Sequence, residues 1–250
     1  MVKTRKSKIV SFDIETSPSR GWYFNLYQEG NILEVDQHWH IMSFAYKYLG
    51  DDKVYVVSMR DFPLYKKDKN DDREVVKALW EIANDAEVLI AHNGNSFDVK
   101  RMNARFLAHG LRPPTPYKTI DTKLVAKRYF KFDSNKLDDL ADYLKIGRKL
   151  QTGGKDLWFK CMSGDKKAWD KMCEYNKWDV VLLEKVYLKM LPYMTTHPNY
   201  NLLNGTTHNC PNCGENKLQK RGIATTRVSM SQRYQCTGCG SWSQGEKIAR

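Results

Sequence analysis

Four acidic residues lie in short motifs whose residue types could bind divalent metal ions. Asp13 and Glu15 belong to SFDIET, Asp98 ends HNGNSFD, and Asp179 ends YNKWD. Carboxylate oxygens are the ligands that hard cations such as Mg²⁺ and Mn²⁺ prefer. Two such ions roughly 4 Å apart can activate a water, stabilise a leaving oxygen and neutralise a phosphate that gains charge. The four acids are therefore candidates for phosphodiester chemistry.

The first two acids are expected on one face of a β-strand. Residues 8–15 are rich in β-branched and aromatic side chains, and the breaker Ser17-Pro18 follows them. Because side chains alternate along a strand, Asp13 and Glu15 point the same way, roughly 7 Å apart along it. A divalent cation would remove the repulsion between the two carboxylates. The alternative is an edge strand with a solvated polar face.

The other two acids are expected on helices. Between residues 164 and 191 apolar residues recur at steps of three and four, and Tyr175 and Asp179 fall one turn apart on the same stripe. A carboxylate on such a stripe needs a metal, a Lys or Arg partner, or hydrogen-bond donors. Asp98 follows a strand over 87–91 and lies in the first turn of the next helix, where the backbone alone would favour a carboxylate.

In this order the three motifs resemble those of the DEDD 3′-to-5′ exonucleases of the ribonuclease H-like fold, in their tyrosine subgroup. The resemblance covers roughly residues 8–192 and includes the proofreading domains of family B DNA polymerases and free-standing relatives in phages and bacteria. The histidine subgroup would have a histidine at position 174, where this chain has Glu174. The resemblance implies two Mg²⁺ or Mn²⁺ ions held by four acids: Asp13, Glu15, Asp98 and Asp179.

The same resemblance implies roles for four further residues. Tyr175 would orient the attacking water, and as a phenol with an ordinary pKa of about 10 it would be neutral at pH 7. Thr16 and Asn93 would lie near the terminal nucleotide of the substrate, with Phe97 packed close by. Asp121, in contrast, is expected to cap a helix and to stay outside the catalytic set.

A second set of chemically active residues lies near the end of the sequence. Two C-x-x-C knuckles, Cys210/Cys213 and Cys236/Cys239, resemble a zinc ribbon and are expected to bind one structural Zn²⁺. Two disulfides or free thiols are the alternative, which the paired spacing disfavours. Residues 208–250 carry seven Lys and Arg against two Glu, so this module is basic and suits contact with nucleic acid; a ribbon that docks a protein is the other reading.

The charge and hydropathy of the sequence indicate which partners and which location to expect. A formal charge of +12 points to a polyanion such as nucleic acid, with DNA favoured and RNA open, because contacts to the 2′-hydroxyl cannot be read from sequence. No apolar run approaches the roughly 18 residues of a membrane span. We expect no membrane contact and a cytoplasmic location, which for a phage protein would be the host cytoplasm.

The order of predicted elements indicates an α/β fold with a mixed central sheet flanked by helices, as the ribonuclease H-like fold would have, plus a small C-terminal zinc ribbon. A loop over 18–37 is followed by a strand hairpin over 40–59, a helix over 71–84, a strand near residue 88 and alternating elements after it. The expected division is an exonuclease domain over 1–194, a linker over 195–207 and the ribbon over 208–250.

The sequence therefore favours a two-metal-ion 3′-to-5′ exonuclease that acts on single-stranded DNA ends, with a separate polymerase or replication protein as a partner. A ribonuclease or structure-specific endonuclease of the same fold is one alternative. A non-catalytic nucleic-acid or replisome adaptor is another, although such an adaptor would have no use for clustered carboxylates facing a polyanion.

Overall fold

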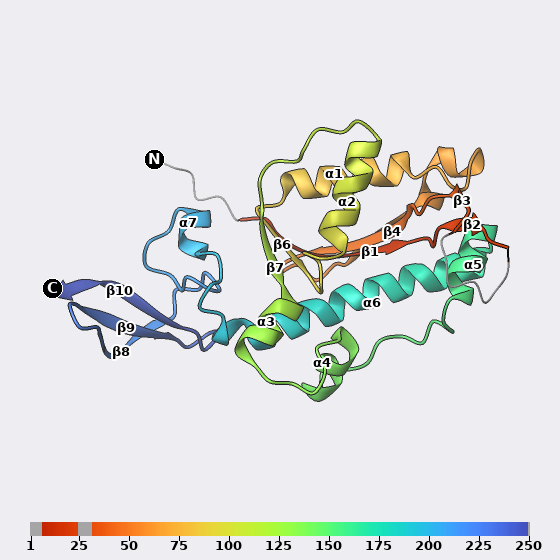
Figure 1. Ribbon diagram of the computed structural model, residues 1–250. Helices are drawn as coiled ribbons and strands as arrows, with labels where there is room; N and C mark the ends of the chain where they lie inside the picture. Colours follow the sequence, from red (N-terminus) through yellow and green to blue (C-terminus); the bar gives the residue numbers. More distant parts are fainter. Residues whose placement is uncertain (1–6, 25–31, 250) are drawn as a thin grey trace.

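A five-stranded mixed sheet lies at the centre of the computed structural model, which describes residues 7–24 and 32–249 (Figure 1). The strands lie in the order β5 (Tyr55–Ser58), β4 (Ile41–Tyr48), β1 (Ile9–Thr16), β6 (Val88–Ala91) and β7 (Lys118–Asp121). β1 pairs antiparallel with β4 and parallel with β6, and β6 pairs parallel with β7. The predicted mixed sheet is confirmed, and β1 lies in its middle.

Helices cover both faces of this sheet (Figure 1). α1 (Arg73–Asp85) and α2 (Asp98–Ala108) pack together on one face, where they bury Val10, Phe12 and Ile14 of β1. The long helix α6 (Lys166–Met190) crosses the other face, beside α3 (Thr122–Tyr129) and α4 (Leu137–Tyr143). The alternation of β1 thus directs Asp13 and Glu15 toward α6.

α6 begins at a well-defined cap. The Asp165 side chain accepts from the backbone N–H of Ala168 at 2.9 Å, which satisfies one of the free donors of the first turn. Gly164, with φ of 96°, ends the preceding helix α5 (Asp156–Ser163) in the left-handed conformation that glycine tolerates. The local sequence pattern did not predict α5.

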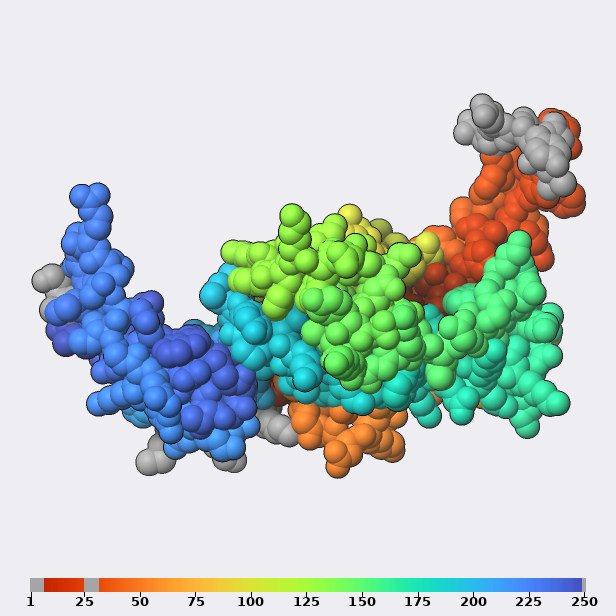
Figure 2. All heavy atoms as spheres, turned by 90° about the horizontal axis from the view of Figure 1, so that it is seen from below, coloured from red at the N-terminus to blue at the C-terminus, as the bar shows by residue number. Residues whose placement is uncertain are grey.

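The segment 18–37, predicted as a loop, contains two short strands in its described part. β2 (Arg20–Trp22) and β3 (Glu34–Gln37) pair antiparallel, so the loop prediction is wrong there. Their side chains are largely exposed, and the alternation that marks a half-buried strand is therefore missing from the sequence. Figure 2 shows this hairpin projecting from the body of the molecule. Residues 25–31 of the predicted loop lie outside the described residues.

The C-terminal region forms a separate three-stranded antiparallel sheet of β8 (Leu218–Thr225), β9 (Met230–Cys236) and β10 (Trp242–Ala249). It lies beyond the end of α6, in blue in Figure 1. Asn212, between the first two cysteines, donates from Nδ2 to the carbonyls of Leu191 at 3.3 Å and Met194 at 3.1 Å. The knuckle therefore satisfies backbone acceptors at the end of α6.

One short helix and several 3₁₀ turns are also present among the described residues. Helix α7 (Tyr200–Asn204) lies within the segment that was expected to be a linker. Three 3₁₀ turns, at Met59–Asp61, Pro63–Lys66 and Leu191–Tyr193, connect larger elements. None of the described helices combines the length and apolar character that crossing a membrane requires.

Candidate active site

Three predicted acids converge between β1 and α6. Asp13, Glu15 and Asp179 each offer a carboxylate oxygen within 4.8 Å of the others. Glu15 is 9% exposed and Asp179 is 1% exposed, so the cluster is largely removed from water. The strand period places the first two acids on the α6 side, and the helical period places Asp179 on the stripe facing them. The two local patterns meet at one site.

Asp98 completes the set from the opposite side of β1. It is buried in the first turn of α2, and its Oδ1 accepts from the backbone N–H of Ile14 at 3.2 Å. That bond fixes α2 to the strand at the residue between Asp13 and Glu15. Asp98 is outside the 4.8 Å group, yet its charge raises the pKa values of both Asp13 and Glu15.

The carboxyl groups of the cluster have raised pKa values, because they are buried close to one another. Burial, followed by the charges of Glu15, Asp98 and Asp179, raises the pKa of Asp13 well above its ordinary value. Burial and the charge of Asp179 raise the pKa of Glu15 to about 8, and burial raises that of Asp98 to about 7. Buried carboxylates this close ionise together only when a cation compensates them. The site is built for added positive charge.

One positive charge comes from Lys149, which sequence reasoning missed. Its Nζ donates to Asp179 Oδ2 at 2.5 Å and to the Tyr175 hydroxyl at 3.1 Å. Burial raises the pKa of Asp179 and Lys149 opposes this rise. The other oxygen, Asp179 Oδ1, is buried without a hydrogen-bond partner among the described residues. Lys149 therefore binds one oxygen of the Asp179 carboxylate, and the other oxygen stays available to another ligand.

Tyr175 and Asn176 occupy neighbouring positions on α6 and face the cluster. Burial, followed by the charge of Asp179, raises the pKa of Tyr175, so its phenol is neutral near pH 7. Asn176 is fully buried and donates from Nδ2 to Asp13 Oδ2 at 2.8 Å. Ser43 of β4 in turn donates to Asn176 Oδ1 at 3.2 Å. The orientation of Asp13 is thus fixed by an amide that sequence reasoning did not single out.

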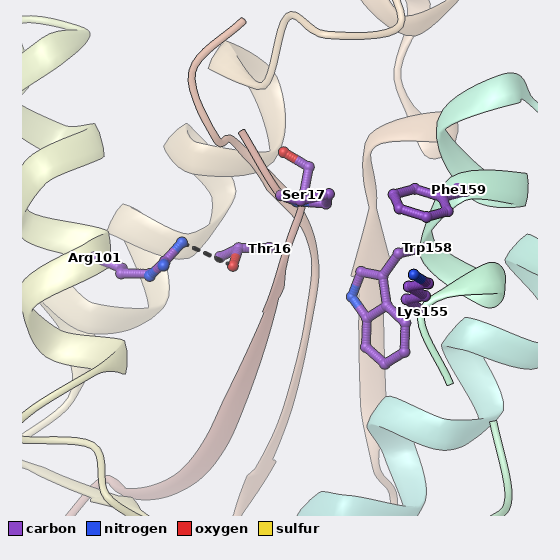
Figure 3. A pocket seen from close by; sticks show the side chains of 7 residues that line it. Thr16, Ser17, Arg101, Lys155, Trp158 and Phe159 are labelled. Carbon is purple, nitrogen blue, oxygen red and sulfur yellow. Dashed lines mark hydrogen bonds between the residues drawn. The ribbon is translucent and has the colours of Figure 1, made fainter. Parts of the chain in front are cut away.

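A pocket of about 450 Å³ opens beside Glu15 (Figure 3). Thr16 and Ser17 of the β1 end form one side, and Trp158 and Phe159 of α5 form another. The indole of Trp158 hydrogen-bonds Glu15, which lowers the pKa of that carboxyl. Two cations, Arg101 and Lys155, complete the lining. The pocket therefore combines aromatic rings with positive charge next to the acids.

The three predicted substrate contacts have different positions. Thr16 lines the pocket and its hydroxyl accepts from Arg101 at 3.0 Å. Phe97 lies against the same guanidinium, whose carbon is 4.6 Å from the ring centroid. Asn93 is not among the residues that line this pocket. It adopts a positive φ of 64°, and its side-chain oxygen accepts a hydrogen bond from Lys123 at 3.1 Å.

Asp121 serves as the predicted cap. Its carboxylate accepts from the backbone N–H groups of Lys123 and Leu124 in the first turn of α3. It also accepts from the N–H of Asn93 at 3.0 Å, which ties this helix end to the turn after β6. Its role is to hold the turn that precedes Asp98.

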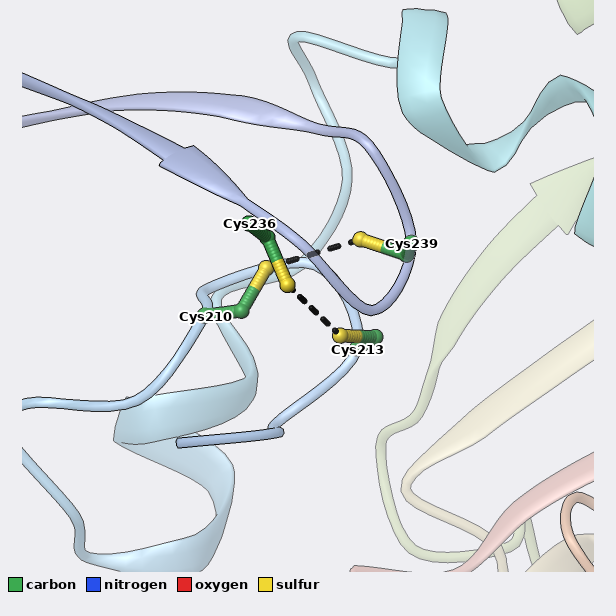
Figure 4. Close-up of side chains that lie close together, drawn as sticks. All are labelled: Cys210, Cys213, Cys236 and Cys239. Atoms are coloured by element: carbon green, nitrogen blue, oxygen red, sulfur yellow. Dashed lines mark hydrogen bonds between the residues drawn. The ribbon is translucent and has the colours of Figure 1, made fainter. Parts of the chain in front are cut away.

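The four C-terminal cysteines form a second candidate metal site (Figure 4). Their Sγ atoms lie within 4.8 Å of one another, and the pairs Cys210–Cys239 and Cys213–Cys236 are 3.7 Å apart. All are free thiols, so the disulfide alternative is not what the structure contains. With Zn–S bonds of about 2.3 Å, a tetrahedral ion would need sulfur separations of about 3.8 Å. The cysteines thus fit zinc.

The mixed sheet with helices on both faces and acids on its central strand defines a nuclease-type α/β fold. The family model of the RNase H superfamily matches residues 29–191, more than half of the sequence, and the chain belongs to this superfamily. No curated protein sequence matches it.

A solved structure has the same fold. The family B DNA polymerase from the hyperthermophilic archaeon Pyrobaculum calidifontis is similar over 89% of this chain, with a TM-score of 0.50 and 14% sequence identity. The similar region covers 31% of that polymerase chain. At this identity the similarity concerns the fold alone.

Proposed function

We propose that the protein is a metal-dependent 3′-to-5′ exonuclease that acts on single-stranded DNA ends. The observation that carries this proposal is the convergence of Asp13, Glu15 and Asp179 within 4.8 Å, with Asp98 hydrogen-bonded to β1 beside them. Membership of the RNase H superfamily and the motif resemblance to proofreading domains support the same reading. Removal of nucleotides from an end distinguishes this proposal from internal cleavage.

The acids fit two Mg²⁺ or Mn²⁺ ions. The donor set is all oxygen, which suits hard cations, and Asp179 Oδ1 is buried without a partner among the described residues. Such ions, when bound, lower the pKa of a water and neutralise charge on the phosphate. The raised pKa values of Asp13 and Glu15 mean that a cation would also return these groups to their ionised form.

The neighbouring residues position the reactants. Tyr175, a neutral phenol one helical turn from Asp179, can hold a water in line with the phosphate by hydrogen bonding. Lys149 orients that phenol and Asp179, and adds a positive charge where the phosphate gains negative charge. Asn176 keeps Asp13 turned toward the cluster.

The pocket beside Glu15 fits the terminal nucleotide. A base can lie against Trp158 and Phe159, and a phosphate can approach Arg101 and Lys155. Because Thr16 lines the pocket directly after Glu15, a nucleotide bound there has its phosphodiester close to the acids. Phe97 would support the pocket by holding Arg101 in place. Asn93 would contact the bound nucleic acid only outside the pocket.

We take residues 1–194 as the nuclease domain, 195–207 as a connection containing α7, and 208–250 as a ribbon that four cysteines would close around one structural Zn²⁺: Cys210, Cys213, Cys236 and Cys239. The basic charge supports a nucleic-acid substrate. A separate polymerase or replication protein in the cytoplasm is the proposed partner.

The test uses single-stranded DNA labelled at its 5′ end, with Mg²⁺, with Mn²⁺ and with a chelator. We expect products that shorten from the 3′ end in the presence of either metal and no cleavage in the chelator. A phosphorothioate at the last linkage should slow the reaction, and a circular single strand should stay intact. Cleavage of the circle would instead indicate an endonuclease, and faster cleavage of a matched RNA would indicate a ribonuclease.

A further inference from the structure

One face of the C-terminal sheet presents an exposed indole among arginine and amide side chains. The cross-strand register places Gln219, Gln235 and Trp242 in one row over the three strands. Arg233 and Gln244 form the next pair on the same face, two residues along β9 and β10. We call this set the Trp242 face, and its members are Gln219, Arg221, Gln235, Arg233, Trp242 and Gln244.

This face is open to solvent and rich in unpaired positive charge. Trp242 is 51% exposed, and the Arg233 guanidinium lies 5.9 Å from the centroid of its ring. Arg221 donates to Gln219 Oε1 at 2.9 Å. In the part of the chain that the structure describes, neither arginine forms an ion pair with a carboxylate, although Lys217 does so with Glu215. The two guanidinium groups are therefore available to an external anion.

Packing of the sheet does not explain the exposed indole. The opposite face carries Tyr234, whose ring covers Gly245 so closely that an added Cβ would lie 2.8 Å from it. Ala224 and Ser231, which pair with each other across β8 and β9, are buried on the same side as Arg233 but toward the other end of β9 from Trp242. Contacts within the ribbon thus use side chains other than Trp242, whose indole remains half in water. An exposed indole beside guanidinium groups can stack on an unpaired base.

We infer that the Trp242 face binds an unpaired nucleic-acid strand, with a base stacked on Trp242 and phosphates beside Arg221 and Arg233. The three side-chain types match three features of an unpaired strand: an aromatic ring for the base plane, guanidinium groups for phosphate, and amides for base edges. Charge favours this occupant over a protein, because residues 208–250 carry seven Lys and Arg against two Glu. The inference rests on the proposed function only in taking nucleic acid as the ligand.

The position of the ribbon decides which part of a strand reaches this face. The ribbon contacts the chain at Leu191 and Met194, just after α6, and α6 rises about 17 Å from Asp179 to Met190. A strand whose 3′ end lies at the acids must therefore extend well beyond the site before it can touch Trp242. Short strands should occupy the catalytic pocket without using the Trp242 face.

The test is a fluorescence-anisotropy titration of the full-length protein, without added Mg²⁺ or Mn²⁺, against labelled oligothymidylate and oligouridylate of about 20 nucleotides. Trp242→Ala and Arg233→Ala should each weaken binding by roughly 10-fold, and Arg233→Ala should also give a shallower salt dependence. Arg227→Ala removes the same charge from an exposed position outside this face and should bind nearly as the parent does. Zinc content and the unfolding temperature of each variant report whether the ribbon is intact.

Cleavage of a strand of about four nucleotides separates this inference from the proposed function. The parent, Trp242→Ala and Arg233→Ala should cleave it equally in Mg²⁺. Weaker binding of long strands without any cleavage would support the Trp242 face and contradict the exonuclease proposal. Unchanged affinity for both long strands in Trp242→Ala and Arg233→Ala, with zinc retained, would overturn the inference and favour a protein partner.

Discussion

Lys149 and Asp179 form an ion pair at the edge of the acid cluster, with Lys149 Nζ 2.5 Å from Asp179 Oδ2. Asp179 is 1% exposed, and its other oxygen lacks a hydrogen-bond partner among the described residues. The lysine therefore neutralises one charge of the cluster without filling the coordination of the carboxylate. It is a counterion that leaves room for a metal.

Replacing Lys149 should separate catalysis from metal binding. Lys149→Met removes the donor to Tyr175 and the positive charge, so turnover should fall by roughly 100-fold. Metal affinity should be unchanged or higher, because the site becomes more negative. The measurement is the rate against Mg²⁺ concentration, with the exposed Lys160→Met as a matched control. Loss of metal affinity in parallel with rate would contradict this role.

Removing the hydroxyl of Tyr175 should slow the reaction without abolishing it. Tyr175→Phe keeps the ring that packs edge-on against Trp158, with centroids 6.3 Å apart. If the phenol only positions the water, the rate should fall by roughly 10- to 1000-fold, with metal affinity unchanged. Single-turnover cleavage at saturating Mg²⁺ measures this effect. A rate equal to that of the parent would show that the hydroxyl takes no part.

The pH dependence of stability should reveal the crowded carboxylates. The pKa of Glu15 is about 8 in the folded protein against an ordinary 4.5, so the folded state binds more protons than the unfolded state between these values. This group's contribution to stability is complete below pH 4.5 and is lost as the pH rises through about 8. Without metal, Glu15→Gln should therefore unfold at a higher temperature than the parent at pH 8.5.

Two comparisons test this explanation by thermal unfolding. At pH 4.5 the parent and Glu15→Gln should unfold at similar temperatures, because Glu15 is then protonated in the folded state. At pH 8.5, Mg²⁺ should stabilise the parent more than the variant, since binding to the folded state adds stability. Equal pH profiles for the two proteins would mean that Glu15 does not carry the raised pKa.

The link between the cysteine knuckle and α6 should contribute to stability. Asn212→Ala would leave the buried carbonyls of Leu191 and Met194 without this donor, at a cost of about 1–3 kcal/mol. The exposed Asn216→Ala in the same knuckle region is the control. Chemical denaturation of both variants, with zinc content measured in parallel, tests the contribution. Equal stability of the two variants would show that the bonds from Asn212 add nothing.

Local patterns predicted much of the fold and the elements that carry the acids, whereas the meeting of these acids at one site was implied by the family resemblance. The alternation of β1 and the stripe of α6 each direct their acids inward, and the two faces meet because the helix covers the sheet. Lys149 could not be found in this way, because it belongs to an aperiodic segment and contacts a residue 30 positions away. Asn176 was not among the residues of the predicted stripe, and its partner Asp13 is 163 positions distant.

Counting bound metal ions tests the central claim most directly. Titration of the metal-free protein with Mn²⁺, followed by calorimetry or electron paramagnetic resonance, should show two ions per chain at the acid site. Asp13→Asn and Asp179→Asn should each reduce this number and abolish cleavage of single-stranded DNA, whereas the exposed Asp52→Asn should change neither. Unaltered Mn²⁺ stoichiometry and turnover in both Asp13→Asn and Asp179→Asn would contradict the assignment of these carboxylates as metal ligands.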